Sequence, residues 1–498
     1  MERLTKILIG ALFGLVALPT FAWKPWPLPM DSADLRRDTL LYGGEMQTVA
    51  ASGTYAPFWF TSDRFGSVSE QPFSGNLSLY FGKELTRPNR WFDYSFGIEG
   101  IGRVDTKKVS AFLQRFYGHV RLYIMDITLG IKPQQYGNQD EELSSGGLLF
   151  SMNSRPMPRI TIGIDQYTPF PLTYGYLEVK GGLTHGWFID NVYVKHSYLH
   201  HKFVAGRLGG KLLVNISYEF HHAAQWGGKS PVHGDLGNSF RNFWNVFWAR
   251  SGGGTINEQI NAYGNHIGSQ NLGIDVKWKN WKVSAYWQSI FEDGPVNIMW
   301  KAMNISDGLW GVSVKQTRWP FISSLCYEFI NTTDQSGSFH DKDGLVFGGD
   351  DNYFNNSVYR NGWNSFYRTI GTPFITSPIY NADGSIATLN NRTMAHHIGL
   401  KGNIYGYRYR TLVTYAENYG LYNDGDALKS TNTAILLEVK KQFPKAWNLD
   451  FSLAFGADIG SQFGNSYSVM FSVTKRGIIK IKTKNEKLES KIKTKHNK

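Results

Sequence analysis

Two neighbouring stretches of the chain alternate apolar and polar residues with a period of two. The apolar positions are Ile274, Val276 and Trp278 in the first stretch, and Trp281, Val283, Ala285 and Trp287 in the second. Asn280 interrupts the alternation between them. A period of two on both sides of a tight turn predicts an antiparallel hairpin with one apolar face and one polar face.

The same alternation recurs along the chain in runs of about nine to eleven residues, the length that a tilted strand needs to cross a bilayer. Four further runs begin at Phe92, Leu212, Tyr405 and Leu449, and another begins at Tyr467. Aromatic residues lie at the ends of the apolar faces, as in the interface girdles of membrane barrels. The opposite faces carry single charges, which a wet or plugged lumen tolerates. We therefore predict an all-β, transmembrane antiparallel β-barrel of roughly 16 to 18 strands, with a soluble periplasmic all-β protein as the alternative.

The first 22 residues have the features of a cleaved secretory signal. Arg3 and Lys6 precede a short apolar run at 7–18, and Thr20 and Ala22 are small residues before the expected cut. After it we expect a periplasmic segment at 23–45 with a short helix over 31–42, the barrel at 46–476, and a basic tail at 477–498. The strands and loops of the barrel account for most of the mature chain.

Charge and cysteine content give no support to a nucleic-acid-binding or disulfide-bonded protein. The net charge of +12 is concentrated at the C-terminus, where ten Lys or Arg and two Glu lie from Lys475 onward, so the rest is nearly balanced. The high charge is therefore no evidence for a nucleic-acid partner. Cys326 is the only cysteine and lies in a strand pattern, so we expect a buried structural thiol and no internal disulfide.

Two connections between predicted strands are long, at about 222–266 and 333–394. The first contains Phe240, Phe243, Trp244, Phe247 and Trp248, whose spacing is that of one face of a helix. We expect this helix, within 238–250, to fold onto the barrel mouth or into the lumen and plug it. Long connections in such barrels are extracellular.

Seven short stretches in order along the chain form a recognisable set. They are 56–59 (APFW), 151–158 (SMNSRPMP), 198–202 (YLHHK), 221–228 (HHAAQWGG), 261–266 (NAYGNH), 359–363 (YRNGW) and 371–373 (GTP). Together these stretches resemble the Wzi-type capsule assembly family, in the branch seen in Bacteroides-like bacteria. The resemblance implies an outer-membrane barrel of 18 strands with a small periplasmic helical part. It also implies a non-enzymatic, lectin-like protein that holds capsular polysaccharide at the cell surface. The short helical segment before the first strand and the Lys-rich extension after the last one depart from that pattern.

Polysaccharide binding needs flat aromatic faces for sugar rings, polar groups for hydroxyls and cations for carboxylates. The candidates lie where one predicted strand leaves the membrane, on the loop helix, and in the second long loop. They are Glu219, His221, His222, Gln225, Trp226, Trp244, Trp248, Arg250, Trp363, Tyr367 and Arg368. The alternative for each residue is packing within a plug, because the same aromatic side chains make good plug cores.

Other chemistry has little support in the sequence. The pairs His200-His201, His221-His222 and His396-His397 lie in strand patterns, where adjacent side chains point to opposite faces and do not converge on one ion. We expect no metal, no cofactor and no enzyme activity, since no G-x-S-x-G or H-E-x-x-H motif occurs. The expected partners are capsular polysaccharide, outer-membrane lipid and lipopolysaccharide, and the polysaccharide export machinery, with the chain itself a monomer. A porin or solute channel, its selectivity set by lumenal Arg408 and Arg410, is the alternative function.

Overall fold

The computed structural model describes most of the chain. The described residues are 39–85, 91–251, 262–292, 304–337, 340–342, 345–348, 351–422, 429–444 and 447–480. The predicted signal peptide at 1–22 lies outside them, as do most of the expected periplasmic segment and of the basic tail. Among the described residues, no helix is both long enough and apolar enough to cross a membrane.

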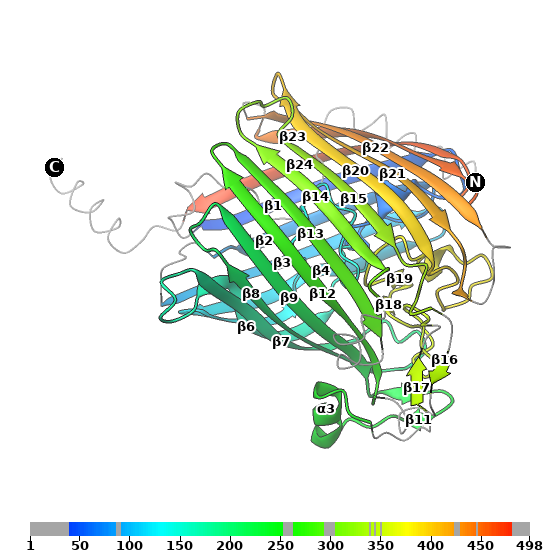
Figure 1. The fold of residues 1–498 in the computed structure, drawn as a ribbon. Coiled ribbons are helices and arrows are strands. Elements are labelled where there is room, and N and C mark those ends of the chain that lie inside the picture. The colour runs from blue at the N-terminus through cyan, green and yellow to red at the C-terminus, as the bar shows by residue number, and fades with distance from the viewer. Residues whose placement is uncertain are drawn as a thin grey trace, which may run out of the picture.

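Eighteen antiparallel strands form one sheet (Figure 1). In chain order they are β1 (Thr39–Ala51), β2 (Phe73–Lys83), β3 (Phe92–Asp105), β4 (Val109–Leu122), β5 (Met125–Ile131), β6 (Pro158–Pro169), β7 (Leu177–Trp187), β8 (Tyr198–Leu208), β9 (Val214–Trp226), β12 (Asn265–Trp278), β13 (Trp281–Glu292), β14 (Gly308–Gln316), β15 (Ser324–Asn331), β20 (Thr393–Ile404), β21 (Tyr407–Asn418), β22 (Ser430–Phe443), β23 (Leu449–Gly460) and β24 (Ser466–Lys480). The sheet closes where β1 pairs with β24, from Thr39↔Lys480 to Ala51↔Ser468. Closure leaves no unpaired edge, and it confirms the predicted barrel.

The other elements of the described residues lie in the connections between barrel strands. The helices described there are α2 (Phe58–Thr61), α3 (Phe240–Phe247) and the 3-10 helix η2 (Pro378–Tyr380). Three small hairpins pair β10 (Lys229–Ser230) with β11 (Gly234–Asp235), β16 (His340–Lys342) with β17 (Leu345–Gly348), and β18 (Asn364–Ser365) with β19 (Arg368–Thr369). In Figure 1, α3, β11, β16 and β17 lie together beyond one end of the tilted strands.

The two ends of the barrel differ in the length of their connections. The long connections are 52–72, 132–157, 227–264 and 332–392, all at the end that we call the loop end. Short turns such as 123–124, 279–280 and 405–406 join strands at the opposite end, the turn end, where Thr39 and Lys480 also lie. Outer-membrane barrels keep short turns in the periplasm and long loops outside the cell, which orients this chain.

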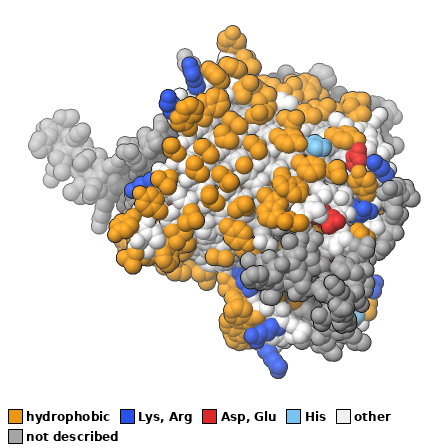
Figure 2. Space-filling view, in the orientation of Figure 1, with side chains coloured by type: hydrophobic (Ala, Val, Ile, Leu, Met, Phe, Trp, Pro, Cys, Tyr) orange, Lys and Arg blue, Asp and Glu red, His pale blue; other side chains and the backbone are white. Residues whose placement is uncertain are grey.

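The alternation of side chains along each strand separates a lipid face from a lumenal face. In the hairpin of β12 and β13, the register pairs Ile274 with Ala285 and Val276 with Val283, as the sequence predicts. These positions share the outer wall, which Figure 2 shows covered with hydrophobic side chains. Tyr286, on the other parity, points into the lumen and donates a hydrogen bond to Glu328 at 2.5 Å.

Three loop-end connections fold back and fill the lumen. They are 52–72, 132–157 and the part of the last long connection at 351–392, and we call them together the plug. Apolar residues of all three share one buried cluster with small inward-facing residues of the strands. The ring of Phe58 stacks on Phe374 at 5.4 Å, and Phe150 meets Trp363 edge-on at 5.7 Å. The lumen is therefore a packed interior and not an empty pore.

Inward polar side chains of the strands hold the backbone of the plug. Asp458 accepts from the Phe58 amide at 2.8 Å, and Glu328 accepts from the Ser145 amide at 2.7 Å. Gln288 accepts from the Leu148 amide at 3.1 Å. A buried loop must satisfy its peptide groups in this way, because water is excluded from it.

Three expectations need correction or adjustment. The aromatic helix forms, with Ser239 as its N-cap, but it packs on the outer wall of β8 and β9 and does not plug the barrel. The lumen is filled by the three loops instead. The helix expected over 31–42 is contradicted at 39–42, which belong to β1, and 31–38 lie outside the described residues. The strands also extend beyond the expected barrel limits of 46 and 476, since β1 begins at Thr39 and β24 ends at Lys480.

The lipid-facing wall predicts the effect of a charge placed there. Leu437 lies near the middle of β22 and is 41% exposed on the outer face. Leu437→Arg should lower the free energy of unfolding by about 2–4 kcal/mol, the cost of arginine near the bilayer midplane. Urea unfolding in vesicles measures it. Tyr405→Arg, in a turn-end connection, is the control and should cost about 1 kcal/mol or less. Equal losses in both variants would contradict the assignment of this face to lipid.

Candidate functional site

Three of the eleven predicted residues line the lumen and are engaged there. Glu219 is fully buried, pairs with Lys180 at 2.6 Å and accepts from the Tyr167 hydroxyl at 3.0 Å. His221 lies 3.3 Å from the Glu219 carboxylate. Gln225 donates to the Ser197 hydroxyl at 3.3 Å. These contacts join strands β6, β7 and β9 and the connection 188–197 to one another, which is the kind of packing that the structural alternative predicts.

Five predicted residues lie on the outer wall or on the helix that covers it. His222 and Trp226 have the outward parity of β9 and are buried beneath α3. Trp226 packs against Phe243 of α3, with ring centroids 6.1 Å apart. Trp244, Trp248 and Arg250 lie on the exposed side of that helix segment. This group is separated by the barrel wall from the lumenal group, so the predicted set does not converge on one site.

The second long loop supplies the last three residues. Trp363 is fully buried in the plug and donates its indole N–H to the Leu149 carbonyl at 2.9 Å. Arg368 is also buried, and it donates to the Val68 carbonyl at 3.2 Å and pairs with Glu70 at 3.5 Å. Tyr367, between them in the chain, is 43% exposed. Of this loop's candidates, only Tyr367 presents its ring to the loop-end surface.

Tyr367 belongs to a surface built from three plug and loop segments. The surface comprises Arg155, Asp190, Tyr193, Arg360 and Tyr367, and we call it the mouth surface. The Asp190 carboxylate accepts from the amide of Phe366, next to Tyr367, at 2.7 Å. The Arg360 guanidinium lies over the Tyr193 ring at 5.6 Å. These contacts fix cations, a carboxylate and aromatic rings at one place.

Arg155 is the most constrained cation of the mouth surface. Its guanidinium carbon lies 4.0 Å from the ring centroids of both Phe112 and Phe366, so the cation is held between two aromatic rings. Burial lowers the pKa of Arg155 to about 10, and it therefore stays charged at neutral pH. Burial raises the pKa of Asp190 above its usual range, while the amide of Phe366 opposes that rise.

Sequence reasoning missed four of these five residues. Arg155 and Arg360 lie inside two of the stretches that carry the family resemblance. The resemblance therefore drew attention to these segments, but it did not indicate that the two arginines belong to a binding surface. Asp190 and Tyr193 come from the short connection 188–197, which has no aromatic periodicity. What joins them is the contact between 188–197 and the segment around Tyr359, which share a small buried cluster. No local pattern in the sequence predicts that contact.

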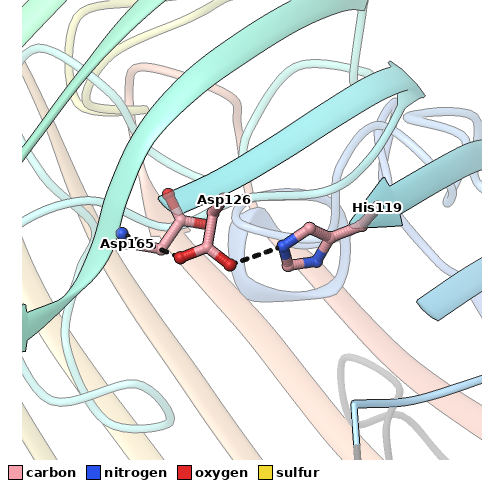
Figure 3. A group of neighbouring side chains, drawn as sticks. All are labelled: His119, Asp126 and Asp165. Carbon is pink, nitrogen blue, oxygen red and sulfur yellow. Dashed lines mark hydrogen bonds and ion pairs between the residues drawn. The ribbon is translucent and has the colours of Figure 1, made fainter. Parts of the chain in front are cut away.

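His119, Asp126 and Asp165 form a group whose donor atoms could surround a metal ion (Figure 3). Figure 3 shows His119 and the Asp165 backbone both directed at the Asp126 carboxylate. The carboxylate lies 2.8 Å from His119 Nε2 and accepts from Arg121 Nε at 2.7 Å. Lys132 lies 3.1 Å from the other ring nitrogen of His119. The positive charges of Arg121 and Lys132 thus already lie beside these carboxylates and this imidazole, which makes the group a poor site for a metal cation.

A polar cavity of about 270 Å³ remains on the turn-end side of the plug. Lys180, Arg207, Lys282 and Tyr167 line it, together with backbone and amide groups of 135–141. It lies below the plug, on the side away from the mouth surface. Its cations stabilise carboxylates of the lumen, as the pair of Lys180 with Glu219 shows.

The closed sheet, its lipid-facing wall and its infolded loops define the class of protein: an outer-membrane β-barrel. Among solved structures, the chain is similar to Wzi, described as an Escherichia coli outer membrane protein involved in group 1 capsule assembly and as a carbohydrate-binding β-barrel. The TM-score is 0.57 at 14% identity, over 93% of this chain and 96% of that chain. It is also similar to OccK5 (OpdH) of Pseudomonas aeruginosa, with a TM-score of 0.47 at 9% identity, over 89% and 98%. No family model and no curated protein matches. Identities this low show the fold alone.

The buried indole of the plug predicts a stability and conductance effect. Trp363→Ala should lower the free energy of unfolding by about 3–5 kcal/mol, since it leaves a large cavity and an unpaired carbonyl. In planar bilayers the variant should pass steady current that the wild type does not. Trp447→Ala, 70% exposed in a turn-end connection, is the control. A wild type with large steady openings would contradict the packed lumen.

Asp63 predicts a dependence of stability on pH. It is buried in the plug, and burial raises its pKa from 3.8 to about 8. The native state then holds a proton that the unfolded state releases above about pH 4, so stability falls as pH rises from 4 to 8, by up to about 1.4 kcal/mol per pH unit. Asp63→Asn should flatten this slope in thermal unfolding. Asp383→Asn, at an exposed loop position, should keep it. An unchanged slope in Asp63→Asn would rule out Asp63 as its source.

Proposed function

We propose that this chain is a non-catalytic, lectin-like outer-membrane protein that binds capsular or exopolysaccharide and anchors it at the cell surface. The observation that carries the proposal is the mouth surface above a filled lumen. A channel needs a continuous aqueous path, whereas a surface anchor needs a rigid platform facing outward. Infolded loops that are packed and hydrogen-bonded to the wall supply rigidity at the expense of an open pore.

The chemistry of the mouth surface fits a polymer that carries hydroxyls and carboxylates. Tyr367 offers an exposed ring for the C–H face of a sugar. Arg155, held between two rings, and Arg360 offer planar donors for carboxylates. Asp190 offers an acceptor for hydroxyls. The described carbohydrate binding of Wzi, a protein of similar fold, agrees with this proposal.

Replacing the exposed ring tests the proposal. Tyr367 has a positive φ of 61°, which asparagine tolerates better than alanine, so Tyr367→Asn removes the ring with little backbone strain. The variant should bind capsular polysaccharide purified from the producing strain about tenfold more weakly, a loss of ~1.4 kcal/mol. Cells carrying it should release more polymer into the medium while total synthesis stays unchanged.

Tyr405→Asn is the matched control, because Tyr405 is 95% exposed in a turn-end connection and also has a positive φ of 51°. It should bind like the wild type. The proposal is wrong if both variants bind alike, or if the wild type binds no polymer and instead conducts small solutes.

A further inference from the structure

Helix α3 lies against the outer wall of the barrel, at the level where the lipid-facing belt ends. The strands beneath it are β8 and β9. On the outward face of β8, Val204 and Leu208 are well exposed. His200 lies on the same face, four residues nearer the loop end than Val204, and it is fully buried. Phe243 and Phe247 of α3 each lie 5.5 Å from the His200 ring. The helix therefore covers the wall directly above the surface that meets lipid.

Polar side chains of the wall explain why the helix must cover this place. His200, His222 and His266 share the outward parity of three neighbouring strands and are all buried. His222 and His266 are hydrogen-bonded through ring nitrogens 2.9 Å apart, and neither ring nitrogen of His200 has a hydrogen-bond partner among the described residues. Imidazoles facing hydrocarbon would be costly, and α3 keeps lipid tails away from them.

Only part of the apolar face of α3 contacts the barrel wall. Phe243, Val246 and Phe247 face the barrel. Phe240, Trp244 and Trp248 follow at spacings of four and are 72%, 41% and 59% exposed. In the view of Figure 2, hydrophobic side chains gather at α3 beyond the hydrophobic wall, with Lys or Arg side chains projecting further out. A soluble surface helix has no reason to expose three such side chains in one stripe.

The charged side chains described on the helix segment, and the one that contacts its C-terminal end, are positive. Arg241 and Arg250 are exposed on and just after the helix. Lys202 of β8 donates to the Phe247 carbonyl at the end of α3, and its ammonium lies 4.0 Å from the Phe247 ring. No Asp or Glu occurs between Leu236 and Ser251. Aromatic residues on one face with cations beside them are the features of a helix that lies in an anionic membrane interface.

We propose that α3 is an interfacial helix whose stripe of Phe240, Trp244 and Trp248 inserts among the lipopolysaccharide of the outer leaflet. The rings lie at the boundary of acyl chains and headgroups, continuous with the lipid-facing belt. Arg241 and Arg250 pair with lipid phosphates. This inference reassigns Trp244, Trp248 and Arg250 from the polymer to the lipid, and it does not depend on the polysaccharide proposal.

Site-directed spin labels on the full chain test the depth of the helix. Trp244→Cys and Trp248→Cys place labels in the stripe, and Asn245→Cys places one on the polar side of the same helix as the matched control. Cys326 is buried, so it should not compete for the reagent. Proteins are reconstituted in vesicles containing lipopolysaccharide and, separately, in phosphatidylcholine vesicles. Collision with oxygen reports lipid, and collision with a water-soluble nickel chelate reports water.

In lipopolysaccharide vesicles, the ratio of oxygen to chelate accessibility should be several-fold higher at 244 and 248 than at 245, and this excess should shrink in phosphatidylcholine. The proposal is overturned if the labels at 244 and 248 reach the chelate as freely as the label at 245. It is also overturned if they are shielded from both probes, which indicates a second copy of the chain. Loss of chelate access only when polysaccharide is added would instead assign the stripe to the polymer.

Discussion

The structure depends on hydrogen bonds between inward polar side chains of the strands and the backbone of the loops that fill the barrel. Closing eighteen strands into a barrel creates an interior that the strand side chains alone do not fill. Folding loops into it buries peptide groups that would otherwise need water. Asp458, Glu328 and Gln288 each accept from a plug amide. The polar parity of the strands is thus a binding surface for the chain's own loops.

The same constraint applies to the charged lumenal residues that the channel alternative would use for selectivity. Arg410 donates to the Glu142 carbonyl of the plug at 3.1 Å and pairs with Glu438 of the neighbouring strand at 3.1 Å. Glu219 is likewise neutralised by Lys180. Both of these charges are therefore matched, Arg410 by a wall residue and by plug backbone and Glu219 by a wall residue, and both contribute to a stable interior.

The sequence predicts the barrel well and the site poorly, and the reason is physical. Period-two alternation reports which parity meets lipid, so Ile274, Val276 and Val283 could be assigned to the wall without a structure. The same parity separates His221 from His222 and predicts that they face opposite sides. Alternation says nothing about where a loop goes after its strand ends. Trp363 and Tyr367 are four residues apart in one loop, yet one is fully buried and the other is 43% exposed.

The misplacement of α3 follows from the same limit. An amphipathic stripe shows that a helix has an apolar partner, but not whether that partner is protein or lipid. Inside the lumen the stripe would have met the plug, whose space is already taken by Phe58, Phe150 and Trp363. On the outer wall the apolar face of α3 has room for both kinds of partner, protein and lipid. One flank of it packs on His200 and Trp226, and the other flank remains exposed. A helix that is apolar over more than its protein contact, on the wall of a membrane barrel, takes the surrounding lipid as its second partner.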